Sequence, residues 1–230
     1  MTSNGKRSTR RSAQGVPATS SGDSLSQVAY DMLLQQILDR TLVGGAVIQE
    51  RRLAEAMGIS RTPMRRALAR LEGEGLLIRL TDRLLSVRLV SLTECLDAMA
   101  VRQMIEPEAA RLATGRIPAA ELEKLKSELS ELMKNKKPSR AMHWAFDDNL
   151  HTAIARHSGN SAIVETITKL RRSTRLFEQM AVPQPTLSPG TEEHLKIIKA
   201  MERGEPDKAA EAMRVHLTLT RRNVLDMLDK

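Results

Sequence analysis

The sequence predicts a mainly α-helical protein with one small β-hairpin. Three observations predict this fold class. Only 2% of the 230 residues are aromatic, so the core must be built from aliphatic side chains and methionine, which suits packed helices. Apolar residues recur at helical spacing over 25–40 and through nearly all of 93–230. They alternate or run together, as in short strands, only within 76–90.

The overall charge and the cysteine count narrow the classes of function. A net charge of +8 favours a polyanionic partner such as nucleic acid, although a solvated basic surface gives the same sum. Cys95 is the single cysteine, so no internal disulfide can form, which fits a reducing, cytoplasmic location. No apolar run approaches the ~18 residues of a membrane span, and the basic N-terminus lacks the apolar segment of a secretory signal.

The N-terminal segment divides into a tail and a helix. Residues 1–24 are rich in Ser, Thr, Gly and Arg, and we expect a disordered basic tail that either touches DNA phosphates or is inert. A helix is expected over 25–40, with Ser24 as its cap. Gly44-Gly45 then breaks the chain, so the next element starts in a new direction.

Two short helices and a hairpin follow. The first helix covers about 50–57 and ends at Gly58. The second begins after only a few residues, with Thr62 as its expected cap and Pro63 at its first position. The hairpin is expected over 76–80 and 84–90.

The remaining residues are predicted to form an all-helical antiparallel bundle. Pro107 lies inside the first of these helices and should bend it. The expected helices cover about 93–114, 118–134, 139–157, 160–180, 190–203 and 206–229.

The segment RRLAEAMGISRTPMRRALARLEGEGLL, residues 51–77, is typical of a winged helix-turn-helix. It consists of a helix, a Gly-containing turn and a second helix, and the hairpin follows. Such proteins place the N-terminal residues of the second helix on base edges in the major groove. Arg61, Arg65 and Arg66 lie there, and each guanidinium can bond twice to guanine or to phosphate. The alternative is a helical hairpin with solvated arginines.

This block resembles the DNA-binding domain of the GntR family of bacterial repressors, whose signature reads roughly PGxxLxExxLAxxLGVSRTPVREALxxLExEGL. Most of its positions match over 44–77. Gly44 replaces the usual Pro, and Arg66 replaces a common Glu and adds positive charge. Leu84 replaces the Gly that the family usually has at the tip of the wing. The sequence therefore does not establish whether the wing reaches the minor groove. The expected DNA contacts are Arg51, Arg61, Thr62, Arg65, Arg66 and Arg83.

A possible metal site lies in the second half of the chain. Asp147 and His151 are four residues apart, so both side chains project from one face of a helix and can reach one ion. His194 and His216 lie on two other predicted helices, and helical bundles build metal sites from facing helices in this way. The alternative is that each histidine is a hydrogen-bonded core residue.

Residues 93–230 resemble the FCD effector domain of the FadR subfamily of GntR regulators. The resemblance rests on an Arg-containing first helix, a D-x-x-F-H element in which Leu150 replaces Phe, a Gly-Asn pair, an E-H-x-x-I element and a late His. It implies that Asp147, His151, His194 and His216 bind a divalent metal. Zn, Mn, Ni, Co and Fe(II) all accept such ligands, and the sequence does not choose among them.

The same resemblance implies that Arg102 pairs with the charge of an effector. A buried ion pair between Arg102 and Glu106 is the alternative. His143 lies on the helical stripe of Asp147 and His151, but the family pattern does not use it. Asp148 is a less favoured ligand than Asp147, and His157 is expected to be structural or at the surface.

The predicted function is that of a ligand-responsive transcription regulator, most often a repressor, in the cytoplasm. Residues 25–91 form the winged helix-turn-helix domain, and residues 92–230 form the effector-binding and dimerisation domain. A homodimer would bind a palindromic DNA operator and respond to a small carboxylate at the metal-containing site. The alternatives are a metal-dependent hydrolase that uses the three His and the Asp, and a general nucleoid-binding protein.

Overall fold

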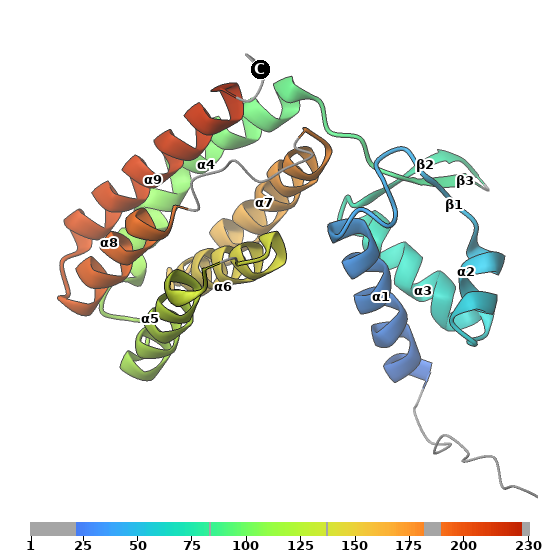
Figure 1. Ribbon diagram of the computed structural model, residues 1–230, viewed down its shortest axis with the longest axis horizontal. Coiled ribbons are helices and arrows are strands. Elements are labelled where there is room, and N and C mark those ends of the chain that lie inside the picture. The colour runs from blue at the N-terminus through green and yellow to red at the C-terminus, as the bar shows by residue number, and fades with distance from the viewer. Residues whose placement is uncertain (1–21, 83, 137, 182–189, 227–230) are drawn as a thin grey trace, which may run out of the picture.

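The computed structural model describes residues 22–82, 84–136, 138–181 and 190–226, and it consists of a small head and a larger helical bundle (Figure 1). Most of the expected basic tail lies outside the described residues, as does Arg83. The head contains the helices α1 (Gly22–Leu38), α2 (Glu50–Ala56) and α3 (Arg61–Gly73) and the strands β1 (Val47–Ile48), β2 (Leu77–Thr81) and β3 (Leu84–Val87). The bundle contains α4 (Leu92–Ala113), α5 (Ala119–Lys134), α6 (Arg140–His157), α7 (Ser161–Ala181), α8 (Thr191–Glu202) and α9 (Pro206–Asp226).

The head is a winged helix-turn-helix. Its described strands form an antiparallel sheet in the order β1-β3-β2, in which β2 and β3 are the expected hairpin. Helices α1 and α3 pack against each other, and Met64, Leu68 and Leu71 bury the inner face of α3. Because the apolar residues of α3 face inward, its arginines are left on the outer face.

Two caps differ from the sequence-based expectation. The N-cap of α3 is Ser60, whose backbone is extended, so Thr62 and Pro63 both lie inside the first turn. Proline is tolerated there because the first N–H groups of a helix have no intrahelical partner. Helix α1 begins at Gly22, so Ser24 lies within its first turn and not at its cap. Strand β1 was not expected, since two residues carry no periodicity.

The helix bounds of the bundle agree with the expected ones to within a few residues. Helix α4 lies at its centre and packs against α6, α7 and α9, while α8 packs against α5 and α9. A capping box starts α4: Glu94 N–H donates to Ser91 Oγ, and Ser91 N–H donates to the Glu94 carboxylate. Pro107 lies inside α4 and is buried. None of the described helices is long and apolar enough to cross a membrane.

The two parts share an apolar contact. Leu176 and Phe177 of α7 and Val224 of α9 belong to the same buried cluster as the core of the head. A separate aliphatic cluster fills the bundle itself and includes Leu129, Leu150 and Ile197. Helix α7 therefore contacts both the bundle and the head.

Candidate functional site

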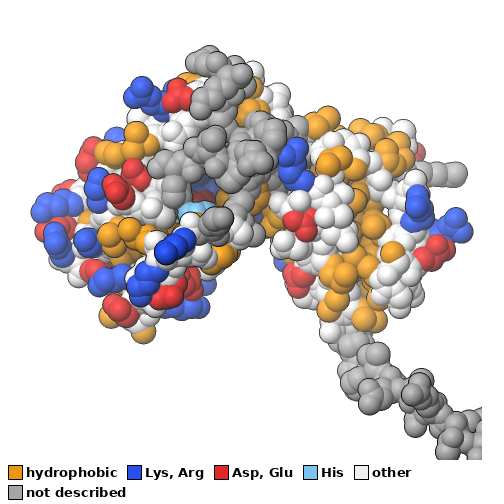
Figure 2. Space-filling view, in the orientation of Figure 1, with side chains coloured by type: hydrophobic (Ala, Val, Ile, Leu, Met, Phe, Trp, Pro, Cys, Tyr) orange, Lys and Arg blue, Asp and Glu red, His pale blue; other side chains and the backbone are white. Residues whose placement is uncertain are grey.

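The structure brings Asp147, His151, His194 and His216 together from α6, α8 and α9. One ligand atom from each side chain lies within 4.8 Å of the others. Asp147 Oδ1 is 3.2 Å from His194 Nε2 and 3.6 Å from His151 Nε2. All three imidazoles are buried. A small area of histidine surface is visible on the larger part of the molecule in the space-filling view (Figure 2). Three helices thus supply one converging set of nitrogen and oxygen donors.

This donor set fits a divalent metal ion. Both ring nitrogens of His194 and Nε2 of His151 are buried without a hydrogen-bond partner among the described residues. Leaving buried polar atoms unsatisfied costs about 1–3 kcal/mol each, so a set of hydrogen-bonded core histidines does not account for the arrangement. A neutral imidazole has one nitrogen with a free lone pair, so an ion between these side chains can accept one lone pair from each histidine together with an oxygen of Asp147. Imidazole and carboxylate are ligands of first-row transition metals.

The electrostatics hold the ligands in the protonation states that metals require. Burial lowers the pKa of His216 well below its usual range, and the neighbouring His194 and His151 lower it further. Burial and then Arg171 lower the pKa of His151. Burial alone would raise the pKa of Asp147, but Arg171 and the histidines hold it well below its usual range. These shifts favour neutral imidazoles at His151 and His216 and an ionised carboxylate at Asp147, the forms that bind metal ions.

A chain of buried polar groups orients His151. Its Nδ1 contacts the carboxylate of Glu106, and Glu106 Oε1 accepts a hydrogen bond of 2.5 Å from Arg102 Nε. Arg102 Nη1 also donates to Thr174 Oγ1 at 3.1 Å. A carboxylate on the second nitrogen of a metal-binding histidine fixes its tautomer and ring orientation. The buried Arg102–Glu106 pair, which was the alternative to an effector-binding Arg102, is therefore present.

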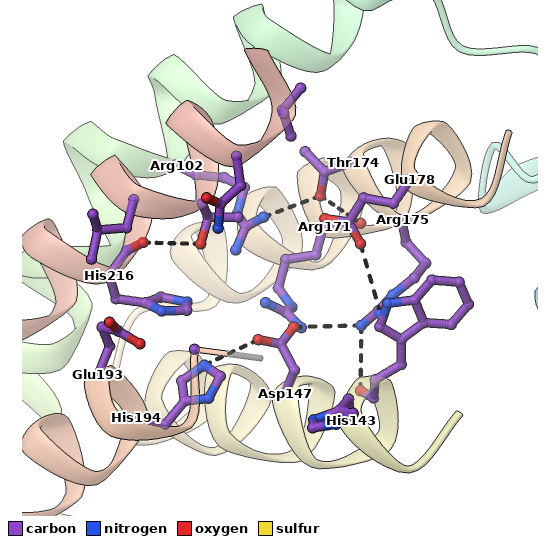
Figure 3. A pocket seen from close by; sticks show the side chains of 16 residues that line it. Arg102, His143, Asp147, Arg171, Thr174, Arg175, Glu178, Glu193, His194 and His216 are labelled. Atoms are coloured by element: carbon purple, nitrogen blue, oxygen red, sulfur yellow. Dashed lines mark hydrogen bonds and ion pairs between the residues drawn. The ribbon is translucent and has the colours of Figure 1, made fainter. Parts of the chain in front are cut away.

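A cavity of about 260 Å³ opens beside the histidines (Figure 3). Arg102 lines it, so the ion pair with Glu106 does not remove Arg102 from a ligand's reach. Helix α7 contributes several polar side chains to its wall. The residues that line the cavity include Arg102, His143, Trp144, Asp147, Arg171, Arg175, Glu178, Glu193, His194 and His216.

Sequence reasoning missed two arginines of this cavity. Arg171 Nη2 donates to Asp147 Oδ2 at 2.6 Å, and Arg175 Nη2 lies 3.4 Å from the same oxygen. Arg175 also stacks on Trp144, with its guanidinium carbon 4.4 Å from the ring centroid. The two arginines are one helical turn apart on α7 and both are buried. That spacing was visible in the sequence, but their partner on another helix was not.

Three other residues weighed from the sequence are also placed. His143 lines the cavity but is not part of the converging set. Asp148 faces the arginines, with Oδ1 2.5 Å from Arg171 Nη2. His157 Nε2 lies 2.9 Å from a carboxylate oxygen of Glu121, which agrees with a structural role.

Gly190 lets the chain pass close to the histidines. It is the N-cap of α8 and has a φ of +60°, a conformation that favours glycine. A Cβ atom at this position would lie 3.3 Å from Cε1 of His216 and 3.6 Å from Cε1 of His194. The close approach therefore needs a residue without a side chain.

The expected DNA-contacting residues form an exposed basic surface on the head. Arg61, Thr62, Arg65 and Arg66 lie on the outer face of α3, and Arg51 is exposed on α2. Glu50 accepts hydrogen bonds from Arg61 Nε and Arg65 Nη2, each at 3.0 Å. A groove runs between α2, α3 and the wing, and its arginines are Arg51, Arg52, Arg61, Arg65 and Arg79. This arrangement suits a phosphate backbone and base edges.

The winged head and the helical domain together define a two-domain DNA-binding regulator. The chain belongs to the GntR family of bacterial regulatory proteins: residues 25–83 match that family and residues 97–219 match the FCD domain. It is accordingly a transcriptional regulator and not an enzyme. This excludes the hydrolase alternative.

Known relatives share both parts of the chain. A probable D-xylose utilization operon transcriptional repressor of Paenarthrobacter nicotinovorans is 25% identical, covering 81% of this chain and 83% of its own length. The HTH-type transcriptional repressor RspR of Escherichia coli is 23% identical, covering 84% and 86%. The structure of E. coli McbR/YncC aligns with a TM-score of 0.74 at 20% identity, covering 88% of this chain and 98% of that one. This last likeness supports the fold.

Proposed function

We propose that this protein is a metal-dependent repressor in the cytoplasm that binds a palindromic DNA operator as a homodimer and senses a small carboxylate. The observation that carries the proposal is the cavity beside the Asp147 and histidine cluster. A divalent metal held by this cluster supplies a Lewis-acid centre that attracts a carboxylate oxygen. Arg102, on the cavity wall, is placed to pair with negative charge on the same ligand.

Helix α7 connects this cavity to the head. Arg171 and Arg175 reach into the cavity, while Arg172 Nη2 lies 3.2 Å from Glu74 Oε2. Glu74 is the C-cap of α3, the helix expected to read DNA. A ligand that favours one position of α7 therefore favours one placement of α3, which is the differential binding that regulation requires.

The homodimer is supported by exposed apolar side chains on the bundle. Helices α4 and α9 pack against each other and leave Val101, Met104, Val215 and Leu219 exposed. Met104 is the most exposed of the four, at 73%, and apolar side chains that gather in one exposed patch mark a protein–protein contact. Two heads in a dimer would place two copies of α3 about one helical turn, ~34 Å, apart on DNA. Sedimentation of the purified protein measures the oligomeric state.

DNA selection from a pool of random duplexes tests the proposed function. We expect a palindromic sequence to be enriched, with an affinity that falls steeply with salt. Arg65→Ala should weaken binding to that sequence by about 1–3 kcal/mol. Arg214→Ala, which removes an exposed arginine of α9, is the matched control and should bind as the unmodified protein does. Enrichment of no sequence would contradict the proposal.

The response to ligand is tested on the selected duplex. A panel of small carboxylates should contain one that changes DNA affinity by at least about fivefold. That change should disappear in His194→Ala, whose DNA affinity without ligand should stay near that of the unmodified protein. A ligand response that survives in His194→Ala would show that the cluster is not the sensing site.

A further inference from the structure

Glu178 is the unusual residue of the cavity. It lies on α7 and its side chain is 15% exposed, so little water reaches the carboxylate. The cation nearest to it in the described part of the chain is Arg175, whose Nη1 is 3.9 Å from Glu178 Oε2, too far for a hydrogen bond. Figure 3 shows Glu178 on the cavity wall beside Arg175. Within the described ranges, Glu178 is therefore a shielded carboxylate whose nearest cation lies beyond hydrogen-bond distance.

The arginines that line the cavity form their shorter contacts with acidic residues other than Glu178. Arg102 Nε is 2.5 Å from Glu106, and Arg171 Nη2 is 2.6 Å from Asp147. Arg175 Nη2 lies 3.1 Å from Asp148 Oδ1, closer than its other guanidinium nitrogen lies to Glu178. Among the described residues, none of these three arginines is within hydrogen-bond distance of Glu178. Burial raises the pKa of Glu178, and the charge of Arg175 opposes that rise.

Glu178 and the histidine cluster lie at two separate places in the cavity. The guanidinium of Arg175 lies between them, with Nη2 3.4 Å from Asp147 Oδ2 and Nη1 3.9 Å from Glu178. Because the guanidinium of Arg175 contacts both acids, the carboxylates of Asp147 and Glu178 lie roughly 10 Å or less apart. A chain of about four or five carbon atoms, at about 1.5 Å per bond, spans that separation.

We propose that the cavity takes a carboxylate with a terminal ammonium group, such as a short ω-amino acid, and that Glu178 binds the ammonium. The inference rests on the proposed function, which places the carboxylate end at the Asp147 and histidine cluster. It adds the chemical class of the far end of the ligand. The cavity volume of about 260 Å³ limits the ligand to a small molecule.

The competing ligand classes fit Glu178 less well. A dicarboxylate of the same length brings a second negative charge against Glu178, which costs free energy in a site shielded from water. A simple monocarboxylate such as pentanoate places an apolar end beside Glu178, so the Glu178 carboxylate loses water and gains no polar partner. An ammonium group supplies three donors and the opposite charge. Of the three classes, the amino acid is the one that brings a positive charge to Glu178.

Three five-carbon probes separate these classes: 5-aminopentanoate, pentanoate and pentanedioate. Each is titrated calorimetrically into the full-length protein purified with its own metal. We expect 5-aminopentanoate to bind about tenfold or more tightly than either of the other two, the gain of a charge-assisted hydrogen bond. In Glu178→Gln this preference should fall to about threefold or less.

Two further variants control the measurement. Glu192→Gln removes the same charge from an exposed position on α8 and should keep the full preference. Glu178→Asp keeps the charge but shortens the side chain, so the preference should move from 5-aminopentanoate toward 6-aminohexanoate. This variant carries the test if thermal unfolding shows that Glu178→Gln does not fold.

The possible outcomes separate this inference from the proposed function. Equal or tighter binding of pentanoate or pentanedioate overturns the inference and leaves a carboxylate sensor standing. An ammonium preference that Glu178→Gln and Glu178→Asp both leave unchanged also overturns the inference. Binding of none of the three probes, nor of any carboxylate in the wider panel, overturns the proposed function and the inference with it.

Discussion

The two carboxylate oxygens of Asp147 face different partners. Oδ1 lies 3.2 Å from His194 Nε2, whereas Oδ2 accepts a hydrogen bond of 2.6 Å from Arg171. Arg171 therefore orients the carboxylate without occupying the oxygen that faces the histidines. Such support keeps a metal ligand in its binding geometry.

Removing Arg171 should destabilise the metal-free protein more than the metal-loaded one. Arg171→Ala leaves Asp147 without its closest cation, and breaking such a shielded pair costs about 3 kcal/mol or more. A bound metal replaces part of the lost positive charge, so the deficit should shrink when metal is present. Denaturant unfolding with and without a chelator measures both values. Equal deficits in the two forms would contradict this role for Arg171.

The metal-free protein should lose stability on mild acidification. His151 and His216 have pKa values lowered chiefly by burial, so the unfolded chain takes up protons at a higher pH than the folded chain does. The free energy of unfolding then falls as the pH drops below ~6.5, by at most about 1.4 kcal/mol per pH unit for each histidine. Urea unfolding at pH 7.5 and 5.5 measures the change. The double variant His151→Gln with His216→Gln should show a smaller one.

Gly190 should matter for metal binding through its lack of a side chain. Gly190→Ala adds a Cβ atom 3.3 Å from Cε1 of His216, and we expect metal affinity to fall by about tenfold. Gly204→Ala is the matched control, because Gly204 also has a positive φ but no atom within 4 Å of the added Cβ. Competition with a chelating dye measures the affinity. A similar loss in both variants would assign the effect to backbone strain alone.

The candidate site was only partly predictable from the sequence. The spacing of Asp147 and His151 predicted a shared helical face. The placement of His194 and His216 on two other predicted helices made them candidate ligands, and the family resemblance strengthened that prediction. No sequence pattern identified Arg171 or Glu178 as cavity residues, because a buried charged side chain can be predicted only when its interaction partners are known. Those partners lie on helices whose packing the sequence does not specify.

At the scale of elements, α7 is the helix with two roles. Arg171 and Arg175 line the cavity, and Arg88 of the head donates to Ser173 at 3.3 Å. Leu176 and Phe177 join the buried cluster of the head. A shift of α7 would therefore change contacts in both parts of the molecule.

Arg172→Ala should uncouple ligand binding from DNA binding. The substitution removes the ion pair with Glu74, so α3 loses one of its links to α7. We expect the ligand-induced change in DNA affinity to shrink by about fivefold, while affinities for ligand alone stay within about twofold. Arg222→Ala, an exposed arginine of α9 paired with Asp226, is the control. Fluorescence anisotropy of labelled operator with and without ligand reports the coupling, and an unchanged response would exclude this route.

The helices were largely predictable, and their caps were not. Gly and Pro residues near the ends of the helices fixed their bounds to within a few residues, because these residues have strong backbone preferences. Thr62 and Ser60 are both good capping residues, and the sequence alone did not distinguish them. The contact between α7 and the head joins residues distant in the chain, so no local pattern revealed it.

On the scale of the whole molecule, the buried cluster of the head extends into the bundle through Leu176, Phe177 and Val224, while a second cluster fills the bundle itself. The head carries a groove lined by exposed arginines, and the bundle holds a polar cavity beside three buried histidines. Parts that are joined weakly can change their relative placement at low cost. A regulator needs this property, because its ligand must alter how the heads are held.

The central claim is that the bundle holds a metal for sensing. Metal content, measured by mass spectrometry on protein purified without chelators or a metal-binding tag, tests it most directly. We predict about one equivalent per chain, lost in His151→Ala and retained in Arg65→Ala, which alters only the head. Protein that contains no metal, or a His151→Ala variant that keeps it, would contradict the claim.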